Sequence, residues 1–227
     1  MSICILHNFT KMNRNIFFDL DGTLSDPRVR LYDLFVDLVP ECKFSFDEYW
    51  EIKRNGIDQV KLLSQYFNYS EEQIVRFRKL WLSKIEDKER LKQDVPFPKS
   101  RALLEKLSKY NYVFIVTERQ KRDLVFWQIR NYGWNEYLKN VLVTRQRTSK
   151  FTIISGNVCV TKHDTIVGDT GEDILTGKKL GIRTVGVTSG LLNRRILSEY
   201  SPDLIISSAD AILEQDDYAS KPLLKAI

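Results

Sequence analysis

No stretch of this sequence is long and apolar enough to cross a membrane. A spanning helix needs roughly 18 consecutive apolar residues, and no run approaches that length. Residues 2–6 are mostly apolar but too few for the core of a signal peptide, and no basic segment precedes them. We therefore expect a cytoplasmic protein with no membrane partner.

Cysteine is scarce as well. Cys4, Cys42 and Cys159 are odd in number and form no C-x-x-C pair, which does not suit a disulfide framework. A reduced cytoplasmic protein is the simpler interpretation.

The sequence also has no long basic stripe with spaced stacking aromatics, the pattern expected of a nucleic-acid-binding face. Lysine and arginine number 35 against 30 aspartates and glutamates, giving a net charge of +5. Acids and bases are mostly interleaved, as in residues 84–90, which is typical of a solvated helix face. We expect no nucleic acid partner, and the positive balance suits steering of an anionic small molecule. Nothing in the sequence indicates an oligomeric state.

What the sequence does contain is typical of a globular protein. Apolar residues make up 43% and charged residues 29% of the 227 residues. A chain of this length holds one full core and a modest second unit.

The chain is organised around residues 16–24. Their first part is strongly apolar and predicts a buried strand. Asp19 and Asp21 are two residues apart, so on a strand their side chains share one face, and Gly22 lets the backbone turn away from the sheet. Two adjacent carboxylates repel each other unless a cation or a shared proton relieves them. We therefore favour a functional site over a plain Asp-Gly turn.

Residues 26–95 contain no strand pattern. Ser70 and Gln73 form a capping box that opens one helix. We therefore expect an all-helical insertion directly after the first strand. Apolar residues recur at helical spacing in four segments, at residues 31–38, 46–52, 57–67 and 74–85.

From residue 96 onward, strand and helix patterns alternate, which predicts a parallel sheet with helices on both faces. The expected fold class is α/β, a doubly wound parallel sheet with an inserted all-helical cap domain. The expected strands after the first are 112–116, 141–143, 165–167, 184–187 and 204–206. The expected domains are a core over 12–25 and 96–227 and a cap over 26–95, with residues 1–11 as an N-terminal extension or the product of an early start codon.

Polar residues follow several of these strands. Asp19 and Asp21 end the first, Thr117 ends the second, and Asp169 follows another with Asp173 four residues on. The carboxyl ends of parallel strands form the ligand-binding edge of an open sheet. We expect these side chains to converge on a metal ion and a phosphate group.

Two lysines are candidates for the cation of this site. Lys150 follows the short strand at 141–143, and Lys162 lies on the loop before Asp169. Lys150 is the favoured candidate, with a plain surface lysine as the alternative for either.

These residue types suit phosphoryl transfer. Asp19 would attack phosphorus as a carboxylate nucleophile. Asp21 would protonate the leaving oxygen and then deprotonate the attacking water. Thr117 and Lys150 would hold the phosphoryl oxygens.

The same edge supplies oxygen ligands for a metal ion. Mg²⁺ prefers oxygen and keeps several waters, so a few carboxylates suffice. Asp19, Asp21 and Asp169 are the expected metal residues, and Asp173 would orient or share the metal shell.

Together the motifs resemble the haloacid dehalogenase (HAD) superfamily, and most closely its phosphoglycolate-phosphatase-like branch. The resemblance implies a Rossmann-like core, a helical C1-type cap at 26–95, and Mg²⁺ bound partly through the main-chain carbonyl of Asp21. It covers about residues 14–213 and rests on D-x-D-G-T at 19–23, the strand 113–117 that ends in Thr, G-D-x-x-x-D at 168–173, and the stretch 177–190.

The sequence departs from this family after Thr117. Glu118 and Arg119 stand where relatives more often have a small polar residue and a lysine. Glu118 falls in the stretch expected to bind phosphate, where an acid is unfavourable unless it points away. Arg119 is either a substrate contact or a surface residue in the first turn of a helix.

The cap should supply specificity. Lys53 and Arg54 precede Gly56 at a helix end and are candidates for contacts to an anionic substrate tail. The alternative is that they complement the helix dipole. The four tryptophans, at positions 50, 81, 127 and 134, lie on helical stretches and are expected as core or cap-packing residues.

The leading functional hypothesis is a Mg²⁺-dependent phosphatase that acts on a small phosphorylated metabolite, such as a phosphoglycolate-like compound, a nucleotide or a sugar phosphate, through an aspartyl phosphate. Asp21 argues against dehalogenase chemistry, because relatives with that activity lack this acid. A sugar phosphomutase shares the core motifs. Phosphonate hydrolysis would need a cap lysine such as Lys53 or Lys61. A HAD-fold binding or regulatory protein without turnover is the remaining alternative.

Overall fold

The computed structural model describes residues 14–215 and Tyr218. Its centre is a six-stranded parallel sheet in the order β5-β4-β1-β6-β7-β8. In β1, Ile16 lies beside Val113 on one side and Thr165 on the other. The strands are β1 (Asn15–Phe18), β4 (Tyr112–Thr117), β5 (Asn140–Val143), β6 (Thr165–Gly168), β7 (Arg183–Val187) and β8 (Leu204–Ile206).

Helices cover both faces of the sheet because β1 is apolar on both. Ile16 and Phe18 pack with α6 (Ser100–Ser108) and α7 (Arg122–Asn131). Phe17 points to the opposite face and belongs to a cluster with Ile154 of α8 (Lys150–Asn157), against which α9 (Gly171–Leu180) also packs. This confirms the predicted doubly wound α/β fold, with the strand order reversing at β1.

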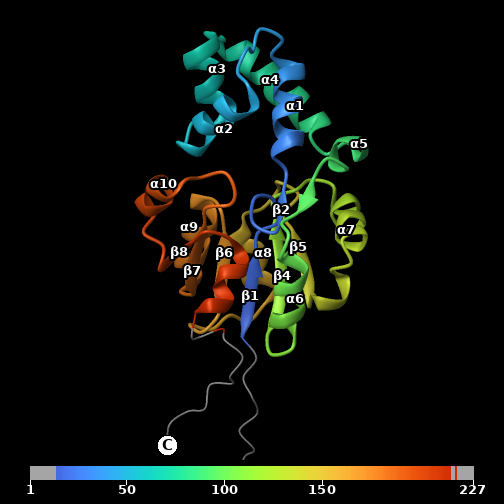
Figure 1. Ribbon diagram of the computed structural model, residues 1–227, viewed down its shortest axis with the longest axis vertical. Helices are drawn as coiled ribbons and strands as arrows, with labels where there is room; N and C mark the ends of the chain where they lie inside the picture. The colour runs from blue at the N-terminus through green and yellow to red at the C-terminus, as the bar shows by residue number, and fades with distance from the viewer. Residues whose placement is uncertain (1–13, 216–217, 219–227) are drawn as a thin grey trace, which may run out of the picture.

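A second, helical unit stands over the carboxyl ends of the strands (Figure 1). It has its own apolar cluster, which includes Phe35, Tyr49 and Phe77. Capping boxes at Ser45 and Ser70 begin two of its helices. The unit comprises α1 (Arg28–Leu38), α2 (Phe46–Arg54), α3 (Gln59–Phe67), α4 (Glu71–Lys84) and α5 (Lys88–Leu91).

The chain enters and leaves this unit through two short antiparallel strands, β2 (Ser25–Asp26) and β3 (Val95–Pro96). The sequence indicated no strand there, since two residues are too few to show a period of two. The short helices α5, α8 and α10 (Arg194–Glu199) were not predicted either. Trp134 lies after α7 and before a 3-10 turn rather than on a helix. The division into core and cap at residues 26 and 95 stays a prediction, and residues 1–11 lie outside the described part of the chain.

Within the described residues, no helix combines the length and apolarity that spanning a membrane requires.

Candidate active site

A cavity of about 260 Å³ lies between the strand ends and the helical unit. Its floor comes from the core and its roof from the helical unit, with Leu31, Trp50 and Trp81 among the roof residues. Trp50 and Trp81 are therefore more than packing residues. The structure brings seven of the predicted residues to this cavity: Asp19, Asp21, Thr117, Glu118, Arg119, Lys150 and Asp169.

Lys150 joins two buried carboxylates on the floor. Its Nζ lies 2.6 Å from Oδ1 of Asp19 and 2.6 Å from Oδ1 of Asp173. All three side chains are almost completely buried. Burial raises the pKa of Asp19, and so do the charges of Asp173 and Asp169, although Lys150 opposes the shift. Burial would lower the pKa of Lys150, but its two carboxylate partners outweigh this and raise it. The ammonium is therefore held charged beside Asp19. Lys162, by contrast, is exposed in the turn before β6.

The Asp169 carboxylate lies near Asp19 and is closely surrounded by main chain at Gly22 and Gly190. Its Oδ2 accepts a hydrogen bond from the main-chain nitrogen of Leu191 at 2.6 Å. A Cβ added to Gly22 or to Gly190 would overlap the Asp169 carboxylate. Gly22 also has a φ of +84°, a conformation that L side chains rarely adopt. Burial, and after it the charge of Asp173, raises the pKa of Asp169 to about 7.

These residues fit a magnesium ion. Burial and neighbouring carboxylates raise the pKa of both Asp19 and Asp169, and a bound cation would favour the ionised form of each. Among the described residues no three His, Cys, Asp or Glu side chains form a metal cluster by themselves. A main-chain carbonyl, water and substrate oxygen would therefore complete the shell, which is the ligand mixture that Mg²⁺ accepts.

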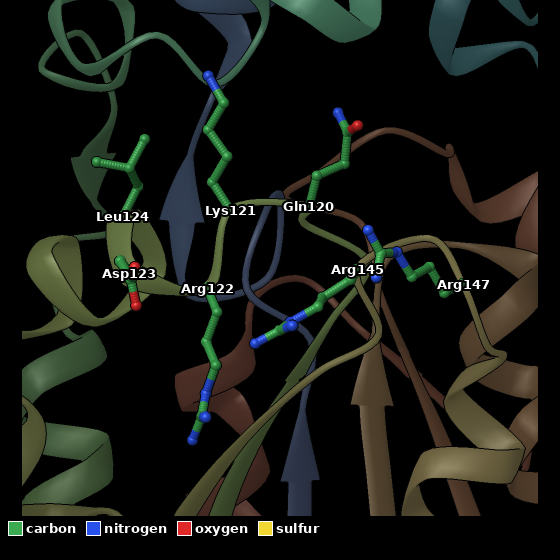
Figure 2. Close-up of a pocket in the computed structure, with 7 residues that line it drawn as sticks. All are labelled: Gln120, Lys121, Arg122, Asp123, Leu124, Arg145 and Arg147. Carbon is green, nitrogen blue, oxygen red and sulfur yellow. The ribbon is translucent and has the colours of Figure 1, made fainter.

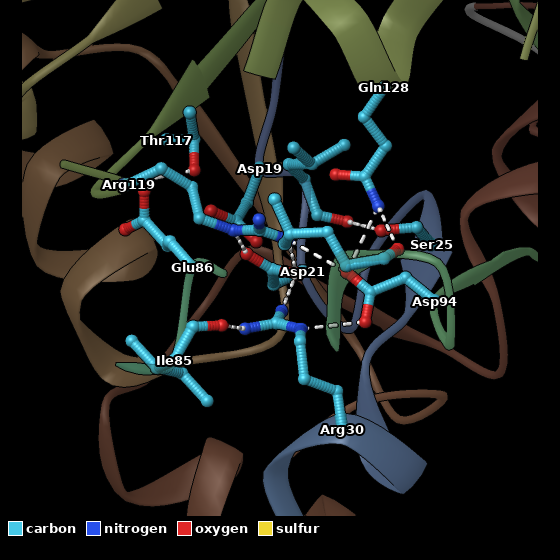
Figure 3. Close-up of polar contacts among 12 residues, drawn as sticks. Asp19, Asp21, Ser25, Arg30, Ile85, Glu86, Asp94, Thr117, Arg119 and Gln128 are labelled. Atoms are coloured by element: carbon cyan, nitrogen blue, oxygen red, sulfur yellow. Dashed lines mark hydrogen bonds and ion pairs between the residues drawn. The ribbon is translucent and has the colours of Figure 1, made fainter. Parts of the chain in front are cut away.

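Two buried arginines hold the side chain of Asp21 (Figure 3). Arg119 donates from Nε to Oδ2 at 2.5 Å and from Nη2 to Oδ1 at 2.6 Å. Arg30 donates from Nη2 to Oδ1 at 3.0 Å. Burial would raise the pKa of Asp21, but Arg119, assisted by Arg30, outweighs burial and lowers it to about 2.

Behind these arginines lies a second carboxylate, Asp94, which is fully buried. Its Oδ1 accepts from Arg30 Nε at 2.7 Å, and its Oδ2 accepts from Arg119 Nη2 at 2.9 Å and from Gln128 Nε2 at 3.0 Å. Sequence reasoning missed Arg30 and Asp94. The available signal was that Arg30 shares the apolar face of its helix with Leu34, four residues on.

Thr117 and Glu118 follow β4 at the cavity. Thr117 is buried, and its hydroxyl accepts from the main-chain nitrogen of Arg119 at 3.4 Å. Glu118 is exposed. Partial burial, together with a hydrogen bond to the Glu172 carboxyl, raises the pKa of Glu118 to about 7.

The structure does not bring Lys53 and Arg54 to the cavity. Arg54 donates to the main-chain oxygens of Gly190 at 3.2 Å and Thr188 at 3.0 Å, which ties α2 to the core. Lys53 is buried, with its Nζ 3.2 Å from Oε1 of Gln59. Burial, only partly offset by the charge of Asp58, lowers the pKa of Lys53 to about 8.

A second cavity, of about 490 Å³, is lined by positive charge. Figure 2 shows its side chains coming from two segments, the start of α7 and the loop between β5 and α8. Within the described chain, the side chains of Arg145 and Arg147 have neither a hydrogen bond nor an ion pair. Gln146, between them, lines the first cavity. Unpaired positive charge therefore lies directly beside the candidate active site.

Comparison with known proteins finds a matching family model and a similar protein. The sequence model of the family described as haloacid dehalogenase-like hydrolase matches residues 16–187. Pyrophosphatase PpaX from Oceanobacillus iheyensis is 23% identical over 208 residues, which are 88% of this chain and 95% of that protein.

Two solved structures share the fold. A haloacid dehalogenase-like family hydrolase from Streptococcus pneumoniae has a TM-score of 0.73 and 23% identity, over 89% of this chain and 97% of that chain. A predicted phosphoglycolate phosphatase from Haemophilus somnus has a TM-score of 0.69 and 19% identity, over 91% of this chain and 99% of that chain. Since the family match spans most of the chain from β1 to β7, the protein belongs to the haloacid dehalogenase-like hydrolase family, as its motifs predicted.

Proposed function

We propose that this hydrolase is a Mg²⁺-dependent phosphatase acting on a small phosphomonoester. The observation that carries the proposal is the position of Asp19, which directly follows β1 at the floor of the cavity, with the Lys150 ammonium 2.6 Å away. The phosphatase class agrees with the names of the relatives, a pyrophosphatase and a predicted phosphoglycolate phosphatase. We further propose that the protein is cytoplasmic.

The carboxylates of Asp19 and Asp21 have different roles in the reaction. An oxygen of Asp19 forms a bond to phosphorus while the bond from phosphorus to the leaving oxygen breaks, giving an aspartyl phosphate. Asp21 is ionised in the free site, so it receives a proton from the monoanionic phosphate ester as the ester binds and gives that proton to the leaving oxygen. Water then attacks the same phosphorus and gives a proton to Asp21, while the bond between Asp19 and phosphorus breaks and frees inorganic phosphate. Lys150 and Thr117 hold the phosphoryl oxygens through both steps.

Asp19, Asp169 and the main-chain carbonyl of Asp21 would hold the magnesium ion. When bound, it neutralises charge on the transferring phosphoryl group. Asp173, which shares Lys150 with Asp19, keeps that lysine in place.

The cavity favours a substrate with an apolar or flat alcohol portion. Its roof presents Trp50, Trp81 and Leu31. Its volume of about 260 Å³ lies below the range of about 300–1,000 Å³ typical of larger ligands. Among the described residues that line it, every lysine and arginine has a carboxylate partner, namely Arg28, Arg30, Arg119 and Lys150. A second anionic group, such as the carboxylate of phosphoglycolate, would therefore have to compete with these carboxylates, and Nη1 of Arg119 is the buried arginine nitrogen there without a hydrogen-bond partner in the described part of the chain.

Hydrolysis of p-nitrophenyl phosphate tests the activity. We expect turnover with Mg²⁺, none with EDTA, and none with Asp19→Asn. A panel that pairs phenyl phosphate with phosphoglycolate tests the substrate portion, and a higher kcat/KM for phosphoglycolate would contradict the apolar roof. A phosphomutase would instead interconvert sugar phosphates with little release of phosphate. Ligand binding without turnover in the whole panel would identify a binding protein.

A further inference from the structure

Four buried or partly buried side chains form a charge-neutral network behind the cavity. Asp21 and Asp94 supply two negative charges, and Arg30 and Arg119 supply two positive charges. Each arginine touches both carboxylates, and Figure 3 shows the two guanidinium groups on either side of Asp21. The arrangement is closed, since every charged member has oppositely charged members as partners.

The network fixes Asp21 while leaving it open to the cavity. Both of its oxygens accept from guanidinium nitrogens, so the carboxylate cannot rotate without breaking a charge-assisted hydrogen bond. Its side chain nevertheless stays 28% exposed and lines the cavity. Asp94, at 0% exposure, does not line the cavity and touches Asp21 only through the arginines.

The members come from both units of the molecule. Asp21 and Arg119 follow strands of the core, whereas Arg30 lies on α1 and Asp94 precedes β3, at the two ends of the helical unit. Arg30 also donates from Nη1 to the main-chain oxygen of Ile85, just after α4. A displacement of the helical unit would therefore move Arg30 and Asp94 relative to Asp21.

We propose that Asp94, acting through Arg30 and Arg119, is a positioning residue that sets the orientation of the Asp21 carboxyl and makes it depend on docking of the helical unit. The inference rests on the proposed function, in which Asp21 transfers a proton to the leaving oxygen. If these ion pairs served only to join the helical unit to the core, one arginine would be enough. Here each oxygen of Asp94 holds a different arginine, and both arginines reach Asp21.

The test compares two aryl phosphates that differ in their need for a proton. The leaving oxygen of phenyl phosphate depends on protonation, whereas that of 2,4-dinitrophenyl phosphate leaves readily as an anion. General acid catalysis contributes about 10²–10⁴-fold where it operates. We expect Asp94→Asn to lower kcat/KM for phenyl phosphate at least about ten-fold more than kcat/KM for the dinitrophenyl ester, because kcat/KM reports the steps up to formation of the aspartyl phosphate, where the two esters differ.

Asp37→Asn is the matched control, because it breaks an exposed ion pair with Arg90 within the same helical unit. It should leave the ratio of the two kcat/KM values unchanged. Arg119→Lys is the second test variant if Asp94→Asn does not fold. It keeps the positive charge but loses the two guanidinium nitrogens that donate to Asp21. We expect it to shift the ratio in the same direction.

Equal loss with both esters, or no loss with either, would overturn the positioning role and assign Asp94 to stability alone. If the wild-type protein hydrolyses neither ester in the presence of Mg²⁺, the proposed function fails first and the inference falls with it. These outcomes are distinct, because the wild-type ratio is measured before any variant.

Discussion

The Nζ atom of Lys150 lies 2.6 Å from Oδ1 of Asp19 and equally close to Asp173. One ammonium thus pairs with two buried carboxylates, one of which, Asp19, is the proposed nucleophile. The lysine therefore both stabilises the folded site and supplies positive charge for the phosphoryl group.

Lys150→Met should remove both contributions. Loss of a charged donor from a transition-state site lowers kcat by about 10²–10³-fold, and leaving two buried carboxylates unpaired destabilises the fold by about 3–5 kcal/mol. Turnover and thermal unfolding, measured on the same preparation, check both effects. Lys162→Met changes an exposed turn residue and should alter neither. Equal effects of the two substitutions would contradict the placement of the site lysine.

Gly22→Ala should damage the metal site specifically. The added Cβ overlaps the Asp169 carboxylate, and the φ of +84° is unfavourable for alanine. We expect loss of activity and loss of the increase in melting temperature that Mg²⁺ gives to the wild-type protein. Gly156→Ala is the control: Gly156 lies in α8 with nothing within 4 Å of an added Cβ. It should stabilise the protein by about 0.4–1 kcal/mol. Retained protection by Mg²⁺ in Gly22→Ala would argue against Asp169 as a ligand.

The pH dependence of stability should reveal the buried amine of Lys53. Its pKa is lowered to about 8 from an ordinary value of 10.5. Between these values the unfolded chain holds a proton that the folded chain has released, so the free energy of unfolding rises with pH across this window.

Replacing this residue with methionine, Lys53→Met, should remove that rise and stabilise the protein at pH 7 by up to about 3 kcal/mol. Urea unfolding of both proteins at pH 7 and pH 10 measures the difference. Parallel pH profiles for the two proteins would show that Lys53 keeps an ordinary pKa in the fold.

The basic cavity should accelerate capture of anionic substrates. Arg145 and Arg147 are exposed and unpaired among the described residues and lie beside the catalytic cavity. The double variant Arg145→Gln/Arg147→Gln should lower kcat/KM by about 10-fold at low salt and much less at high ionic strength, because steering is screened. An equal reduction at all salt concentrations would indicate direct substrate contact instead. Arg76→Gln/Arg78→Gln, on exposed positions of α4, controls for net charge.

Much of the core could be predicted from the sequence because its signals are local. The apolar segment that becomes β1 and the polar residues that end β1, β4 and β6 are adjacent in sequence, and parallel strands carry those ends to one edge. The sequence pattern alone therefore predicts that Asp19, Thr117, Lys150 and Asp169 lie near one another. Which helices cover which face depends on packing and does not follow from local pattern.

The helical unit was harder to predict beyond its helical content. Whether Lys53 and Arg54 reach the cavity depends on how α2 rotates against its neighbours, and periodicity leaves that rotation undetermined. The network of Arg30 and Asp94 joins residues separated by most of the helical insertion, and no short motif records such a pairing. Trp50 and Trp81 show the same difficulty, since an aromatic residue that roofs a cavity has the same spacing as one that fills a core.

The pairing of β2 with β3 brings the entry and exit of the helical unit side by side, with Ser25 opposite Pro96. The helical unit is therefore joined to the core through this one pair of short strands. Exchanging the unit need not disturb the order of the six-stranded sheet. A chimaera that takes its helical unit from another family member would keep the phosphoryl chemistry of the core while changing the chamber above it. The transplanted segment would have to retain Arg30 and Asp94 for the Asp21 carboxylate to keep its orientation.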